Sequence, residues 1–227
     1  MFRKVIAFYA PKLVNILELP GVKSIELTDV SRVTIIYLNL WLRIRWNYDQ
    51  SKGKLPLDLR VQEPDWEMLG IDIDIKCLRE LREQAKKYLF HSTNTFVFAK
   101  TYGVSHLGED TIDRLVSIFQ KNDDLWTCVD RDVVEHAYKH TKAGSPLRRV
   151  LVDGFCAQAN KEDRERVMEM PSAFVVDVVE RSLTMQGALR QMPTACEYHE
   201  HKTDEARKTC DTRVFPRRDN ELASSSL

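Results

Sequence analysis

Apolar residues recur at spacings of three and four over much of the 227-residue sequence, and this period constrains the fold most strongly. It is the spacing at which side chains line one face of an α-helix. From Asp74 onward the apolar residues form such a stripe, with charged residues opposite. The stripe consists of Ile75, Leu78, Leu81, Ala85, Tyr88 and Leu89. Its period predicts an amphipathic helix in this part of the chain.

Similar stripes and turn signals predict the other elements. Further helices are predicted at residues 4–17, 30–44, 96–102, 112–119, 133–138, 147–159 and 172–189. Ser145 can cap one of them, and Pro146 fits its first turn. Residues 23–27 predict a short strand, 65–75 indicate strand or turn, and the β-branched run 33–36 leaves a strand open there. The predicted fold class is α+β, mainly α-helical.

The charge balance excludes several classes of partner. Lys and Arg together number 34, as do Asp and Glu, so the formal net charge is zero. Strong sequence-independent binding to nucleic acid or to an anionic membrane needs excess positive charge, so we expect neither as a partner. No apolar run approaches the roughly 20 residues that span a bilayer, and the apolar stretch 5–10 is too short for a secretory signal. The five cysteines are scattered and odd in number, which predicts a reducing, cytoplasmic or nuclear setting.

Two blocks of sequence carry a family resemblance. Residues 96–107 read Phe-Val-Phe-Ala-Lys-Thr-Tyr-Gly-Val-Ser-His-Leu, and residues 144–153 read Gly-Ser-Pro-Leu-Arg-Arg-Val-Leu-Val-Asp. Both blocks resemble segments of fungal BTB/POZ proteins, although Lys100 and Thr101 stand where that family usually has Asp and Lys. Shorter matches occur at residues 8–13, 25–29, 39–42 and 133–141. Residues 43–90 match the family poorly.

The resemblance implies a domain organisation. A BTB/POZ-like core of short strands and helices would occupy residues 1–120, with 45–64 as an insertion or long loop. Residues 121–192 would form a helical extension, and 193–227 a polar tail. Met1 falls where the family has already completed its first two strands, so the core would be truncated or reduced.

The same resemblance implies a function. BTB/POZ proteins mediate association between proteins, and many act as adaptors for cullin-type ubiquitin ligases. We therefore expect a protein-protein interaction module that forms a homodimer or binds a partner protein, such as a cullin-type ligase. Short helices with apolar stripes on a small sheet would leave grooves and edges where a partner can dock. The sequence has neither a Gly-rich phosphate loop nor a nucleophile elbow, and we predict that the chain is not an enzyme.

The tail holds the most distinctive cluster of ligand residues. Cys196 is followed by His199, His201 and Cys210. Thiolate and imidazole are the ligands that zinc prefers, and a tetrahedral structural site takes four of them. The segment also resembles a Cys-x-Tyr-His-x-His segment at the end of fungal BTB/POZ relatives. The tail is therefore a candidate Zn²⁺ site, and a solvated polar tail is the alternative that the sequence leaves open.

Weaker patterns leave other functions open. His136 and His140 are four residues apart on a predicted helix, but Glu135 precedes them, whereas in zinc proteases the glutamate follows the first histidine. Asp72 and Asp74 would lie on one face of a strand, where paired carboxylates can act as acid and base. The main alternative function is a zinc-stabilised regulatory protein whose tail arginines touch nucleic acid, and an enzyme is the lesser one.

Overall fold

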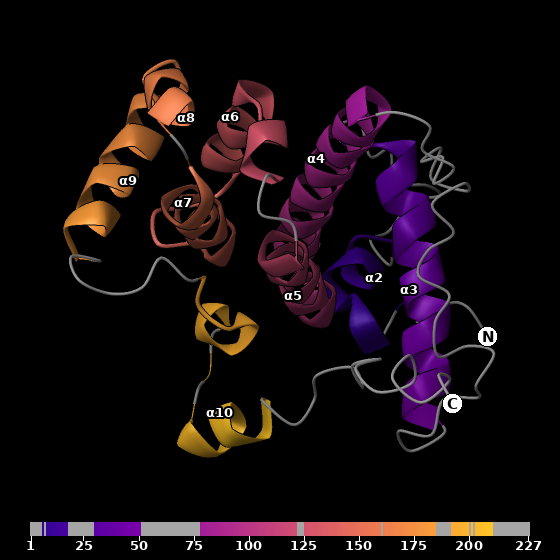
Figure 1. Cartoon of the computed structure of the whole chain (residues 1–227). Helices are drawn as coiled ribbons and strands as arrows, with labels where there is room; N and C mark the ends of the chain where they lie inside the picture. Colours follow the sequence, from indigo (N-terminus) through magenta and orange to yellow (C-terminus); the bar gives the residue numbers. More distant parts are fainter. Residues whose placement is uncertain are drawn as a thin grey trace, which may run out of the picture.

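Helices and the turns between them make up the part of the chain that the structure, a computed structural model, describes (Figure 1). That part comprises residues 6, 8–17, 30–50, 78–121, 125–159, 161–184, 192–199, 201 and 203–210. Its α-helices are α2 (Pro11–Leu17), α3 (Arg32–Gln50), α4 (Leu78–Tyr102), α5 (Ser105–Lys121), α6 (Arg131–His140), α7 (Pro146–Gln158), α8 (Lys161–Val167), α9 (Ser172–Thr184) and α10 (Asp204–Cys210). Two short 3-10 helices, η1 (Leu125–Cys128) and η2 (Ala195–Tyr198), lie among them.

The predicted α+β class is wrong, because the described residues contain no strand and no sheet. The apolar faces of the helices bury one another, so this core needs no sheet to cover it. The β-branched run 33–36 lies inside α3, since packing against neighbouring helices overrides a modest strand preference. A BTB/POZ-like core of short strands is therefore not found there. The strands predicted at 23–27 and 65–75 lie outside the described residues.

Two helices are longer than the sequence pattern predicts. α3 continues to Gln50, so residues 45–50 of the predicted insertion are helical, while 51–64 lie outside the described residues. α4 runs unbroken through the polar stretch 91–95 and joins two predicted helices. The hydroxyl of Thr95 donates to the carbonyl of His91 at 2.8 Å. This bond satisfies the buried hydroxyl within the helix, so the polar stretch need not interrupt it.

Helix ends follow local signals. α7 begins at Pro146 with Ser145 in the N-cap position, as predicted, but the Ser145 side chain makes no capping hydrogen bond. α6 follows Asp130, whose side chain accepts a hydrogen bond from the backbone N–H of Val133 at 3.1 Å. Gly103 ends α4 with a φ of 72°, which glycine adopts without the steric penalty of a Cβ atom. This turn lets α5 pack back against α4.

The larger apolar core lies between α4, α5, α6, α7 and α9 (Figure 1). Trp126 of η1 is only 1% exposed and fills its centre. Its ring stacks on Phe174 of α9, with 5.7 Å between centroids, and meets Phe155 of α7 edge-on at 4.9 Å. Aromatic pairs in these geometries each contribute about 0.5–1.5 kcal/mol beyond the burial of their area. The short η1 thereby ties α7 to α9.

A second, smaller core joins α2, α3, the end of α4 and the start of α5. Tyr9 lies edge-on to Trp41 of α3, with 5.5 Å between the ring centroids. The indole N–H of Trp41 donates to Oδ2 of Asp110 on α5 at 2.6 Å. Burial raises the pKa of Asp110, and the hydrogen bond from Trp41 opposes that rise. α5 therefore contributes to both cores, and it is also a helix on which η2 packs.

Candidate metal centre

The predicted ligand residues lie on a short C-terminal segment that folds against the bundle (Figure 1). Cys196 belongs to η2, His199 is the C-cap of η2, and Cys210 is the last residue of α10. A capping box opens η2, in which the backbone N–H of Thr194 donates to the Glu197 side chain at 3.3 Å. This cap fixes the start of the turn that carries Cys196 and His199.

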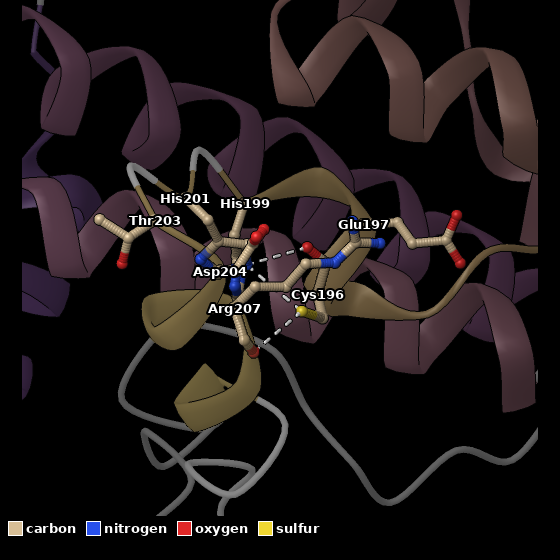
Figure 2. A pocket seen from close by; sticks show the side chains of 7 residues that line it. All are labelled: Cys196, Glu197, His199, His201, Thr203, Asp204 and Arg207. Atoms are coloured by element: carbon tan, nitrogen blue, oxygen red, sulfur yellow. Dashed lines mark hydrogen bonds between the residues drawn. The ribbon is translucent and has the colours of Figure 1, made fainter.

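Three of the four predicted ligands converge. The ligand atoms of Cys196, His201 and Cys210 all lie within 4.8 Å of one another. Figure 2 shows Cys196 and His201 side by side, with Sγ 3.3 Å from Nε2. Zinc bonds of about 2.3 Å to sulfur and about 2.0–2.1 Å to nitrogen would set tetrahedral ligand atoms about 3.3–3.8 Å apart. The group could therefore hold a metal ion after small side-chain shifts.

His199 touches this group at one point. Its Nδ1 lies 3.0 Å from Sγ of Cys210, whereas its ring centroid is 5.8 Å from that of His201. The His199 side chain is only 8% exposed. The structure thus brings three predicted ligands together and places the fourth in contact with one of them.

The other ring nitrogen of His199 faces an acidic residue of α5. Nε2 lies 2.7 Å from Oδ1 of Asp113, which makes an ion pair when the ring is protonated. Both atoms are buried, and neither makes a hydrogen bond of regular geometry among the described residues, so they meet as a close charge pair. Burial alone would lower the pKa of His199, but the contacts with Asp113 and Cys210 together raise it to about 9. The surroundings of His199 therefore favour a proton on its ring.

Tyr198 and Arg149 fasten the segment to the bundle. The Tyr198 hydroxyl donates to Oδ2 of Asp153 on α7 at 2.8 Å, and Arg181 of α9 donates to the other carboxylate oxygen. The Arg149 guanidinium donates to the backbone carbonyls of Glu197 and Tyr198 at 3.0 and 3.1 Å. Burial and Asp153 raise the pKa of Tyr198, so its phenol keeps the proton that it donates. Cys196 and His199 therefore lie on backbone that the bundle already holds.

The cluster borders an open hollow of about 470 Å³ (Figure 2). The hollow is lined by Cys196, Glu197, His199, His201, Thr203, Asp204 and Arg207. The carbonyl of Arg207 on α10 lies 4.0 Å from Sγ of Cys196, so α10 lies across one side of the cluster. Ions in solution can reach the ligands through the hollow.

The zinc-protease pattern does not form a site in the described part of the chain. The rings of His136 and His140 lie 4.5 Å apart between centroids on α6. Oε2 of Glu135 lies 3.6 Å from Nε of Arg131, with which it forms an ion pair. Among the residues that the structure describes, no third ligand residue joins these histidines in a group that could hold a metal ion. Four residues of the weaker predictions lie outside the described part, namely Asp72, Asp74, Arg217 and Arg218.

Some residues around the cluster escape prediction from the sequence. Asp113 precedes His199 by several helices, so no spacing along the chain connects the two. Arg149 acts through two carbonyl groups, which any residue could supply. The burial of Tyr198 could have been predicted, because an aromatic residue within a polar tail suggests an anchor to the core. In the structure Tyr198 is 1% exposed.

Comparisons of the chain with protein-family models, with curated proteins and with solved structures found no match. Among the described helices, none is both long and apolar enough to cross a membrane. The function is therefore inferred from the cluster and from the surface of the bundle.

Proposed function

We propose that the chain is a non-catalytic protein-interaction module whose C-terminal segment is organised by a structural Zn²⁺ ion. The observation that carries this proposal is the convergence of Cys196, His201 and Cys210, whose ligand atoms lie within 4.8 Å of one another. His199 would complete the set through Nδ1, which lies 3.0 Å from Sγ of Cys210.

The ligand chemistry supports zinc in a structural role. Cys196 and Cys210 supply thiol sulfurs, and two thiolates with two imidazoles form a common tetrahedral zinc set. Four protein ligands leave no position for a reactive water, so this set favours structure over catalysis. α10 has only seven residues, and isolated helices shorter than about 12–15 residues are marginal in water. Zinc would supply folding free energy that so short a segment lacks.

The surface of α9 supports association with a protein. Val176, Val179 and Leu183 are spaced three and four residues apart, so they share one helix face. They are 54%, 53% and 62% exposed. Apolar side chains gathered on one exposed face are typical of protein contacts, and an apolar helix of a partner would fit against them. The resemblance of residues 144–153 to BTB/POZ proteins also supports association, with a homodimer or a cullin-type ligase as the predicted partner.

The metal content of the purified full-length chain tests the zinc part of the proposal. Elemental mass spectrometry should find one zinc ion per wild-type chain. The Cys196→Ser and Cys210→Ser variants should each retain only a small part of this zinc content. Cys156→Ser is the matched control, because it removes a half-buried thiol of α7 outside the cluster. A chain that takes up no zinc on refolding with Zn²⁺ would contradict the proposal, as would full zinc content in both ligand variants.

Light scattering and calorimetry test the interaction part. A homodimer would have about twice the chain mass of 26.4 kDa, and Val179→Glu should return it to a monomer. If the wild-type chain is a monomer, we expect binding to a purified cullin N-terminal domain, weakened by the same variant. A wild-type chain that neither dimerises nor binds the cullin would contradict this part.

A further inference from the structure

We propose that Asp113 of α5 is a positioning residue of the metal centre. Its carboxylate holds the His199 ring so that Nδ1 faces the ion, and ion binding thereby fastens the C-terminal segment to α5. The inference rests on the proposed zinc site and adds to it a residue from outside the segment that carries the ligands.

The two ring nitrogens of His199 face different groups. Nε2 lies 2.7 Å from Oδ1 of Asp113, and Nδ1 lies 3.0 Å from Sγ of Cys210. A histidine that binds a metal through one nitrogen usually gives the N–H of the other to a carboxylate or a carbonyl group. That contact fixes the tautomer and the orientation of the ring. An ion that displaces the proton of Nδ1 would leave the remaining proton on Nε2, facing Asp113, so that Nδ1 supplies the lone pair.

Asp113 is the only group in the described residues placed to orient this ring through Nε2. Nε2 of His199 and Oδ1 of Asp113 are both buried and make no hydrogen bond of regular geometry there, so the 2.7 Å contact is the polar contact that joins them. The His199 side chain is 8% exposed and the Asp113 side chain 37% exposed. The ring is therefore enclosed, while the carboxylate lies at the edge of the bundle, where an amide can replace it without opening the core.

Other contacts hold the backbone on which His199 lies. Tyr198 is bonded to Asp153 at 2.8 Å, and Arg149 binds the carbonyls of Glu197 and Tyr198. Because these bonds place the backbone, Asp113 acts mainly on the orientation of the ring. Loss of its carboxylate should therefore change metal affinity more than it changes the fold.

The placement of Asp113 on α5 would let a bound ion link the C-terminal segment to the bundle. α5 contacts the segment at a second point, where the side-chain amide of Gln120 donates to the carbonyl of Pro193 at 3.3 Å. An ion held by Cys196 and Cys210 together with His199 would join both ends of the segment to Asp113 on α5. Metal binding would then tighten the contact between the segment and the bundle.

The zinc affinity of the full-length chain, measured by competition with a chromophoric chelator, tests the proposal. Asp113→Asn should weaken zinc binding by about 10–100-fold, the usual effect of losing such a carboxylate, and still bind one ion. Asp113→Glu should recover part of the affinity, because it restores a carboxylate. Glu109→Gln is the matched control on α5, since it removes one negative charge from an exposed pair with His106 at 3.2 Å. Its zinc affinity should stay near that of the wild-type chain.

Cobalt absorption supplies a readout that a purely structural role would not change. The visible bands of Co²⁺ report the ligand field, so Asp113→Asn should shift them and Glu109→Gln should not. An Asp113→Asn chain with wild-type zinc affinity and an unchanged cobalt spectrum would overturn the positioning role while leaving the zinc site in place. A wild-type chain without zinc binding would instead overturn the proposed function. If Asp113→Asn fails to fold, the same two measurements on Asp113→Ser decide, and wild-type zinc affinity with an unchanged cobalt spectrum in that variant would also overturn the role.

Discussion

The hydroxyl of Tyr198 donates a hydrogen bond to Oδ2 of Asp153 at 2.8 Å, at a place that solvent barely reaches. The two residues are 1% and 4% exposed. Asp153 also accepts a hydrogen bond from Arg181, so one carboxylate joins α7, α9 and the C-terminal segment. The segment that carries the metal ligands therefore belongs to the same hydrogen-bonded unit as the bundle.

Tyr198→Phe should lower the free energy of unfolding by about 1–3 kcal/mol, because it leaves a buried carboxylate oxygen without its donor. Urea denaturation followed by circular dichroism measures the change. Tyr102→Phe, at the half-buried end of α4, is the control and should cost less than Tyr198→Phe. Equal effects of the two changes would show that the bond to Asp153 adds nothing to stability.

Phe174→Ala should destabilise the chain by about 3–5 kcal/mol, since it empties the space beside Trp126 in the larger core. Phe174 is 0% exposed, whereas Val176 on the same helix is 54% exposed. Val176→Ala should therefore change the free energy of unfolding by only about 0.5 kcal/mol or less. If both variants lost a similar free energy of unfolding in urea denaturation, the result would contradict the burial of Phe174 and the exposure of Val176 on α9.

The pH dependence of stability should carry a contribution from His136. Its Nε2 is buried without a hydrogen-bond partner among the described residues, and burial, then His140 and Lys139, lower its pKa below 6.5. Protonation therefore favours the unfolded chain, in which the pKa is about 6.5. The stability that comes from the neutral His136 ring is fully present above pH 6.5. It is lost as the pH falls from 6.5 through the lower pKa of the folded chain, and the free energy of unfolding then changes by at most about 1.4 kcal/mol per pH unit.

Urea unfolding between pH 4.5 and 7.5 should consequently be less pH-dependent for His136→Gln than for the wild-type chain. The titration of the His136 ring, followed by nuclear magnetic resonance, gives the midpoint directly. A midpoint at or above 6.5 in the folded chain would contradict the effect of burial.

Zinc should raise the free energy of unfolding with the logarithm of its free concentration relative to the dissociation constant. A free concentration 100 times that constant should add about 2.7 kcal/mol to the free energy of unfolding. Comparison of zinc-saturated and chelator-treated chains by urea denaturation measures this difference. Cys210→Ser should remove most of it, whereas a zinc effect of the same size in that variant would mean that the ion acts elsewhere.

Local features of the sequence were sufficient to predict several helices. Pro146 predicted the start of α7, because its fixed φ suits the first turn, and Ser145 occupies the N-cap position without a side-chain capping hydrogen bond. The continuity of α4 was not predictable in this way, since Thr93 and Thr95 look like a polar break but are 1% and 3% exposed. Their burial depends on helices far along the chain. The strand alternative at 33–36 was wrong for the same reason, because packing of α3 decides the conformation there.

The candidate metal site was predictable in its ligands and not in its surroundings. Cys196, His201 and Cys210 were predicted from residue type and spacing, and the structure brings them together. Asp113 was not predicted, because its contact with His199 exists only once α5 and the C-terminal segment are packed. A pattern read along one segment cannot contain a residue that the fold supplies from another.

X-ray absorption spectroscopy at the zinc edge of the full-length chain tests the proposed zinc centre most directly. We predict two sulfur ligands at about 2.3 Å and two nitrogen ligands at about 2.0–2.1 Å, supplied by the pairs Cys196 with Cys210 and His199 with His201. A chain that holds no zinc, or zinc surrounded only by oxygen and nitrogen, would contradict this structure of the C-terminal segment.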